Sequence, residues 1–505
     1  MISRRFHSIV RRSVVQSRVA KNRVAQGLVV GGLLLGLVGC TGEDATDAAR
    51  YDGPPRHLIL VTVDTLRADH LGAYGYPRDT SPAIDALAAS GTLFERAIAQ
   101  WPKTGPSFAT LFTGQYPHTT GLTHKAALRV PDAYLTLAEY LKHAGFTSLA
   151  VVSNGVLAQH LGWNQGFDAY AQTWSLTPEQ SSDPKEYRKW INARRVNQLA
   201  LPLLDQHRDA ERLFVWLHYS DPHAPYVLPE DFPNPFIDDP YYVGDETVRL
   251  ENPRATALGD RRDLKHYVAA YDANILFADQ YIAKALDHAD GLGILDDALV
   301  VFTADHGESL GEHDYYFGHG RLPHNPGSHV PLIVSTPGDR AAGPATGRRV
   351  PEPVELVDLY PTLRQLLGLD KEVPGLEGES FAHHVQGTPP DLAEALALAF
   401  SHAGGGSPLT HYRSVQDERW KLVFHPARNS KKKPRPESWA LYDLETDPGE
   451  TQNLLEEQSR ETRRLRRDLK DWMDGRTWIT PPKQEIEAHS EEIMRALEAL
   501  GYVDG

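Results

Sequence analysis

The sequence predicts an α/β protein with a mostly parallel sheet between helices, followed by a smaller C-terminal α+β subdomain with a short antiparallel sheet. Two observations carry this prediction. Runs of β-branched and aliphatic residues recur along residues 56–397, separated by stretches with helical periodicity, a pattern typical of parallel strands buried on both faces. From about residue 398 the apolar runs shorten and turn residues join them directly, which predicts antiparallel strands.

The first predicted strand is His57–Val63 (HLILVTV). Similar runs predict strands at Ser148–Ser153, Leu213–Leu217, Ala298–Thr303 and Pro331–Ser335. Helical periodicity predicts helices at Ala83–Ala89, Leu135–His143, Ala193–Gln206, Tyr267–Asp287 and Val354–Leu367. Because strands alternate with helices, we expect βαβ units, in which ligands bind at the carboxyl ends of the strands.

Residues 398–505 form the predicted C-terminal subdomain. Its expected strands are Tyr412–Val415, Trp420–His425 and Trp439–Tyr442. Charged helical patterns predict two further helices, from Thr451 to about Asp474 and from Lys483 to Leu500.

The N-terminal segment reads as a targeting signal. Residues 1–39 hold seven basic residues and no acidic ones, and the apolar run from Gly27 to Gly39 ends at Cys40, as in secretory signals. Leu37-Val38-Gly39-Cys40 also resembles a bacterial lipobox. We therefore expect residues 1–39 to be a lipoprotein signal peptide. Cys40 would be the lipidated terminus, anchored to a membrane of the bacterial cell envelope, and residues 40–55 a flexible tether. The alternative is an uncleaved membrane helix, although about 13 apolar residues fall short of the roughly 20 that span a bilayer.

Charge and cysteine content exclude two classes of protein. The formal net charge is -15, and it falls to -22 once the seven basic residues of 1–39 are set aside. The chain after residue 39 is strongly negative and would repel the phosphate backbone of a nucleic acid. We therefore expect no nucleic-acid partner. The single cysteine rules out an internal disulfide framework.

Ligand-type residues follow two of the predicted strands. Asp64 comes directly after the first strand, and Asp305-His306 after the strand at 298–303. A buried carboxylate is costly unless it is paired or metal-bound, so these three residues predict a divalent-cation site, while a helix N-cap is the alternative for Asp64. Six histidines surround the two segments in the sequence, and for His313 and His329 a structural role is the better explanation. The others are His218, His223, His319 and His324.

Several longer stretches carry a family resemblance. They are VTVDTLRADHLGAYG (61–75), TGQYPH (113–118), HYSDPHAPY (218–226), TADHGESLGEH (303–313), VPLI (330–333), WKL (420–422), LYDLETDPGETQN (441–453) and LEALGYV (497–503). In this order and spacing the chain resembles the sulfatase family of the alkaline phosphatase superfamily, from about residue 57 to 503. The resemblance implies an alkaline-phosphatase-like core at 56–397 that hydrolyses sulfuric or phosphoric esters on a divalent cation (Ca²⁺, Mg²⁺, Mn²⁺ or Zn²⁺). A second cation would use His223, His319 or His324.

The chain departs from the family at the nucleophile. Where sulfatases carry the Cys or Ser that becomes formylglycine, ten residues before Gly114, this chain has Thr104. Phe108 replaces the arginine of the same motif, and Thr65 replaces the family's second Asp. Threonine cannot yield the aldehyde, so we do not expect formylglycine chemistry. A threonine hydroxyl at a helix N-terminus beside a cation can itself attack an ester, as in related nucleotide phosphodiesterases and phosphoethanolamine transferases.

The resemblance also suggests roles around Thr104. His223 and His319 would bind the ester oxygens or protonate the leaving group, and His218 and Asn154 would contact the substrate. The predicted function is a metal-dependent hydrolase of an anionic ester. One alternative is a catalytically silent binding protein of the same fold, with Thr104 only capping a helix. The other is a transferase of phospho groups to an envelope lipid or glycan, which ranks lower because such enzymes usually carry several membrane helices.

Overall fold

The computed structural model describes residues 53–123, 129–176, 191–238, 263–388, 397–404, 411–427 and 434–476. The predicted signal peptide, Cys40, most of the tether and the expected helix at Lys483–Leu500 lie outside these residues. The helices of the described part include none long and apolar enough to cross a bilayer.

An eight-stranded mixed sheet forms the centre of the fold, in the order β10-β2-β9-β6-β1-β5-β3-β4. Its strands are β1 (His57–Val63), β2 (Thr92–Ile98), β3 (Thr147–Val152), β4 (Ala169–Gln172), β5 (Leu213–Tyr219), β6 (Ala298–Ala304), β9 (His329–Ser335) and β10 (Arg348–Glu355). β1 runs parallel to β5 and β6, and every residue of these three strands is buried. β9 is antiparallel to both of its neighbours, β2 and β6. The predicted α/β class with a mostly parallel sheet is confirmed.

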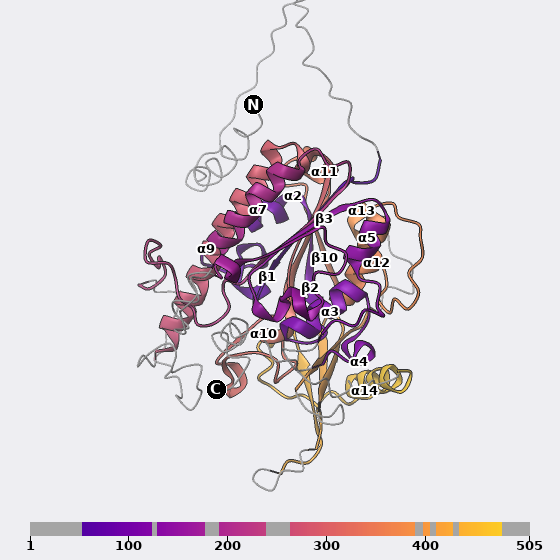
Figure 1. The fold of residues 1–505 in the computed structure, drawn as a ribbon. Coiled ribbons are helices and arrows are strands. Elements are labelled where there is room, and N and C mark those ends of the chain that lie inside the picture. The colour runs from indigo at the N-terminus through magenta and orange to yellow at the C-terminus, as the bar shows by residue number, and fades with distance from the viewer. Residues whose placement is uncertain are drawn as a thin grey trace, which may run out of the picture. The chain divides into compact units, whose positions relative to one another are not determined.

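Helices cover both faces of this sheet (Figure 1). The helices that pack against one another on one face are α2 (Pro82–Ser90), α7 (Ala193–His207) and α9 (Leu264–Gly291). Those on the other are α3 (Thr104–Thr113), α5 (Leu137–His143), α12 (Leu359–Leu366) and α13 (Ala382–Gln386). Shorter helices are α4 (Pro117–Thr120), α10 (Asn325–Ser328) and α11 (Pro337–Ala342). With both faces covered, the apolar runs of the central strands have no solvent side.

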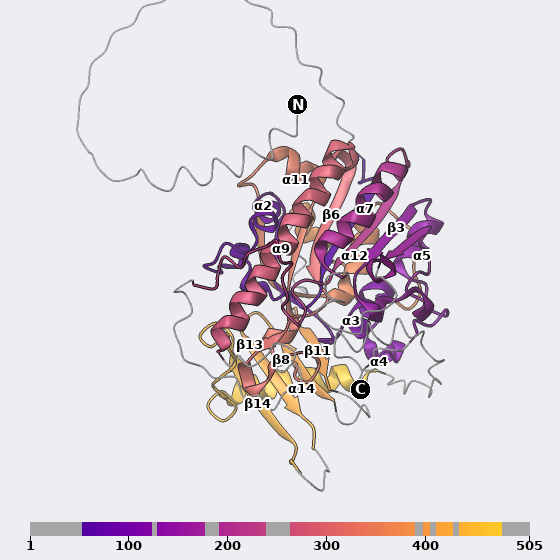
Figure 2. The ribbon, with the colours of Figure 1, turned by 60° about the vertical axis from the view of Figure 1, so that its left-hand side comes forward.

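The C-terminal part forms a separate antiparallel sheet, as expected. Its strands are β11 (Ala399–Ala403), β12 (Tyr412–Gln416), β13 (Trp420–His425) and β14 (Ser438–Asp443), and α14 (Ser459–Asp474) packs on it (Figure 2). The amide of Phe400 donates to Glu355 Oε1 at 3.0 Å, so this sheet is attached where β10 ends. A two-stranded hairpin, β7 (Ser309–Leu310) with β8 (Tyr316–Gly318), lies in the loop after β6.

Two expectations about secondary structure were wrong, and strands β2, β4, β10 and β11 of the two larger sheets were not predicted. Val354 and Glu355 complete β10, so the helix predicted from Val354 is only α12. The helix predicted from Thr451 begins at Ser459. Strand β2 was missed because Glu95 and Arg96 interrupt its apolar run, at the point where its pairing with β9 shifts register.

Candidate functional site

The candidate site forms at the carboxyl ends of β1 and β6. These strands are paired in parallel, with Val63 opposite Ala304, so the residues that follow them, Asp64 and Asp305, emerge side by side. After Asp64 the chain turns through Thr65 in the left-handed region (φ 56°), and the Thr65 amide donates to Asp305 Oδ1 at 3.3 Å. The turn thus ties the two strand ends together.

Asp64, Asp305 and His306 present one ligand atom each within 4.8 Å of one another, and all three are buried. His306 Nε2 lies 3.8 Å from Asp64 Oδ1 and 3.4 Å from Asp305 Oδ2. Both of these carboxylate oxygens are buried and lack a hydrogen-bond partner in the described part of the chain. Buried oxygens without donors are costly, and a divalent cation with oxygen and nitrogen ligands would satisfy both.

The electrostatics of the two carboxyl groups also favour a bound cation. Burial, and then the charge of Asp64, raise the pKa of the Asp305 carboxyl well above its usual value. Burial also opposes ionisation of Asp64, but His223, followed by His218 and His306, outweighs it and brings its pKa below the usual range. Two carboxylates this close do not both ionise readily without a cation between them.

The tautomer of His306 can be inferred from its contacts. Its Nδ1 lies 2.9 Å from the carbonyl oxygen of Gly307, which can only accept a hydrogen bond. Nδ1 therefore carries the proton, and Nε2 turns its lone pair toward the carboxylates. Burial lowers the pKa of this imidazole, which keeps the neutral form suited to binding metal.

Thr104 begins helix α3 and is fully buried. Its Oγ1 lies 3.3 Å from His306 Nε2, beside the three candidate ligands. Lys103, with extended backbone, occupies the N-cap position, so Thr104 is the first residue of the helix and not its N-cap. One turn along, Ser107 Oγ donates to the carbonyl oxygen of Asp305 at 2.5 Å, which fixes the start of α3 against the end of β6.

His223 and His319 lie on the same site. Their ring centroids are 5.3 Å apart, and the His319 ring is 4.4 Å from that of His306. His223 is held through Nδ1 by the carbonyl oxygen of Ala224 at 2.6 Å. His319 Nδ1 is 3.0 Å from Glu308 Oε1. Each ring is thus fixed through its Nδ1 atom.

The two predicted substrate contacts, Asn154 and His218, both touch Asp64. Asn154 Nδ2 donates to Asp64 Oδ2 at 2.5 Å, and His218 Nε2 lies 3.8 Å from the same oxygen. His218 Nδ1 is also 3.1 Å from Thr62 Oγ1. In the structure Asn154 holds the Asp64 carboxylate by a hydrogen bond, and His218 lies beside it.

The remaining histidines lie elsewhere. His329 Nε2 bonds the carbonyl oxygen of Glu95 at 2.8 Å, as expected for a structural residue. His313 and His324 lie against each other and beside Glu450, a residue of the C-terminal part.

Sequence reasoning gave no role to Glu308 or Lys103. Glu308 is fully buried and accepts from Tyr226 Oη at 3.0 Å in addition to its contact with His319. The sequence could have indicated Glu308 as a site residue, because it lies two residues after the Asp305–His306 pair. The stem of Lys103 packs so closely on Gly320 that a side chain there would clash, and, in addition to burial, the charge of Lys103 contributes to the lowered pKa of His306.

Comparison with known proteins matches two family models to the chain. The model described as Sulfatase covers residues 56–369, and the model described as N-sulphoglucosamine sulphohydrolase, C-terminal covers residues 311–476. An ulvan-active sulfatase of Formosa agariphila is 25% identical over 454 residues, which is 86% of this chain and 84% of the relative. A choline-sulfatase of Rhizobium meliloti is 25% identical over 453 residues, covering 79% of this chain and 82% of the relative.

Solved structures share the fold. A structure in complex with its substrate, D-glucosamine-2-N,6-O-disulfate, superposes with a TM-score of 0.65 at 17% identity, covering 86% of this chain and all of the other. The phosphonate monoester hydrolase of Agrobacterium radiobacter gives 0.64 at 20% identity, covering 83% and 96%.

Proposed function

The chain belongs to the sulfatase family and is an ester hydrolase, and from this premise we propose that Thr104 is the nucleophile of a metal-dependent hydrolase of sulfuric or phosphoric esters. One observation carries the proposal. The Thr104 hydroxyl, at the start of α3, lies 3.3 Å from His306 Nε2, next to two buried carboxylate oxygens that have no hydrogen-bond donor in the described residues.

The family generally uses a divalent metal, and the donor set of this chain fits one. Asp64, Asp305 and His306 would hold the cation, which would act as a Lewis acid toward the ester oxygens and favour the ionised form of a neighbouring hydroxyl. Asn154 keeps Asp64 oriented, with His218 beside it, as outer partners of metal ligands do.

The reaction would take place in two displacements, the first by Thr104 and the second by water. Thr104 Oγ, after its proton has passed to solvent, forms a bond to the sulfur or phosphorus of the ester, and the bond to the leaving alcohol breaks. His319, fixed through Nδ1 by Glu308, gives the leaving oxygen a proton from Nε2. Water then attacks the same sulfur or phosphorus and gives a proton back to His319 Nε2, the ester bond to Thr104 Oγ breaks, and sulfate or phosphate leaves. His223 lies within reach to bind the ester oxygens.

The substrate is an anionic ester. Similar proteins include an ulvan-active sulfatase, a choline-sulfatase, a protein solved with a disulfated glucosamine and a phosphonate monoester hydrolase. The replacement of the formylglycine position by Thr104 leaves both sulfate and phosphate esters open to direct attack.

The place of action is proposed from the sequence alone. The basic and apolar segment that ends at Cys40 would direct the chain out of the cytoplasm and anchor it by a lipid to a membrane of the cell envelope. Mass analysis of the mature protein tests this. A mature terminus upstream of Cys40, or one without acyl chains, would contradict it.

Turnover of aryl sulfates, aryl phosphates and aryl phosphonates, measured with added Mg²⁺, Ca²⁺, Mn²⁺ or Zn²⁺ and again with chelator, tests the proposal. We expect metal-dependent hydrolysis of at least one ester class. If no ester turns over with any metal, the chain is a binding protein of this fold. If product forms only when an alcohol acceptor is present, it is a transferase.

A further inference from the structure

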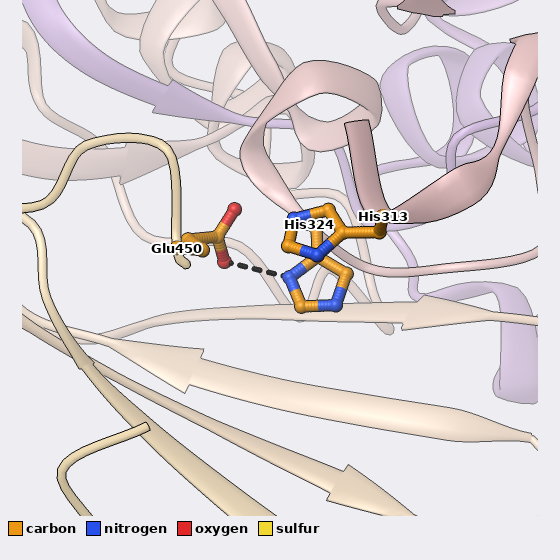
Figure 3. Close-up of side chains that lie close together, drawn as sticks. All are labelled: His313, His324 and Glu450. Carbon is orange, nitrogen blue, oxygen red and sulfur yellow. Dashed lines mark hydrogen bonds and ion pairs between the residues drawn. The ribbon is translucent and has the colours of Figure 1, made fainter. Parts of the chain in front are cut away.

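A second group of metal-ligating side chains lies apart from the ester site, where the loop after β6 meets the C-terminal part. His313 lies between β7 and β8, His324 directly precedes α10, and Glu450 follows β14. One ligand atom of each lies within 4.8 Å of the others. Figure 3 shows the two imidazole rings one over the other, with the carboxylate at their side. The ester chemistry described above uses none of the three.

The two rings are closely stacked. Their centroids are 3.9 Å apart and their planes differ by 16°, and His324 Nδ1 lies 3.0 Å from Glu450 Oε1. Nε2 of His313 is buried and finds no hydrogen-bond partner within the described residues. Two imidazolium rings at this separation would repel each other, so at least one ring is neutral and offers a lone pair to a metal.

The carboxylate is held as metal-binding carboxylates usually are. Glu450 is almost fully buried, its Oε1 lies 3.0 Å from Lys421 Nζ, and its Oε2 accepts from the Asn325 amide at 2.6 Å. Lys421 is fixed in turn by Asn325 Oδ1 at 2.8 Å. These bonds set the orientation of the carboxylate.

Lys421 also limits which cation could bind. Because the ammonium neutralises Glu450, the cluster offers two imidazoles and no excess negative charge. Ca²⁺ and Mg²⁺ depend on several oxygen ligands, usually charged. Zn²⁺ and its neighbours among the transition metals bind well to imidazole nitrogen with a single carboxylate.

We propose that His313, His324 and Glu450 form a second metal site, specific for a transition-metal cation such as Zn²⁺. The ligands come from both parts of the fold, so the cation would fasten the loop that carries His319 to the C-terminal sheet. The remaining coordination position would take water.

The test counts metal ions in the purified full chain. The first site is removed with Asp64→Asn and Asp305→Asn, and Zn²⁺ affinity is measured by competition with a chromophoric chelator, with Co²⁺ as a spectroscopic substitute. In this background we expect one bound equivalent and Co²⁺ absorption bands of a four-coordinate site. Adding His313→Ala should weaken binding by roughly tenfold or more. His313 is half-buried, so the variant should fold, which circular dichroism checks.

His384→Ala is the matched control. Its ring lies 4.0 Å from that of His383, but within the described residues this pair belongs to no group of three metal ligands. The control should bind Zn²⁺ as the background protein does. Equal affinity with and without His313, or no bound equivalent in the background protein, would overturn the proposal. Preference for Ca²⁺ over Zn²⁺ would also overturn it.

Discussion

The hydroxyl oxygen of Thr104 lies 3.3 Å from Nε2 of His306, although 202 positions separate the two residues in the sequence. Helix α3 begins with Thr104, and its next turn is bonded to the end of β6 through Ser107. The nucleophile and the candidate metal ligands are therefore positioned by one rigid contact between a helix start and a strand end. Because Ser107 makes this contact, the Thr104 hydroxyl can be removed without disturbing the position of the helix.

Thr104→Ala should abolish ester hydrolysis, with kcat reduced by about 10³-fold or more, because loss of a nucleophile removes the first displacement. Metal content and melting temperature should change little, since Lys103 and not Thr104 is the N-cap. Initial rates measure the loss of activity. Mass spectrometry of the wild-type protein, quenched during turnover, detects the sulfate or phosphate ester on Thr104, which Thr104→Ala cannot form. Thr113→Ala, a loss of one hydroxyl on the same helix, is the control and should keep wild-type rates. If Thr104→Ala also keeps them, water is the nucleophile.

Metal removal should destabilise the protein. With the cation at 100 times its dissociation constant, binding to the native state adds about 2.7 kcal/mol to the free energy of unfolding. Asp305→Asn should abolish this increment and activity together. In the absence of metal it should be close to the wild type in stability, because burial and the charge of Asp64 raise the pKa of Asp305 and so favour its uncharged form, which the amide resembles. Thermal unfolding with and without chelator, in the His313→Ala background that weakens the second proposed site, measures both effects. A metal-dependent shift that survives there in Asp305→Asn would count against this ligand set.

The sequence was sufficient to predict why Asp64 and Asp305 meet. Each follows an apolar run that only a buried parallel strand explains, and parallel strands end at the same edge of a sheet. The sequence could not show that Asn154 and His218 contact Asp64, because that depends on β5 lying between β1 and β3. The order of strands in a sheet depends on tertiary packing and cannot be read from one sequence. The same holds for the contact between Glu450 and His324, which are far apart in the sequence.

Glu308→Gln tests how His319 is prepared as an acid. The substitution keeps an oxygen near His319 Nδ1 but removes the negative charge that favours the protonated ring. We expect kcat to fall by up to about 100-fold, and the limb of the pH–rate profile that reports protonated His319 to move to lower pH. Tyr226→Phe removes the other partner of Glu308 without changing the charge, so it should leave that limb in place. Identical profiles for Glu308→Gln and the wild type would exclude the role.

Asp279, on α9, should make stability depend on pH far from the active site. Its carboxylate accepts from the amides of Ala83 and Ile84 in the first turn of α2, yet burial, together with the charges of Asp85 and Asp79, raises its pKa to about 7. Between pH 4 and 7 the native carboxyl holds a proton that the unfolded chain has released.

The free energy of unfolding therefore falls as pH rises through this window, by about 1.4 kcal/mol per unit at most from this group. Asp279→Asn keeps an oxygen for both amides and cannot ionise, so it should lose this dependence and be more stable than the wild type at pH 8. Urea unfolding at pH 5 and pH 8 measures the difference. Asp79→Asn, at an exposed position, is the control and should retain most of the slope. A wild type and an Asp279→Asn variant with equal slopes would show that Asp279 is ionised throughout.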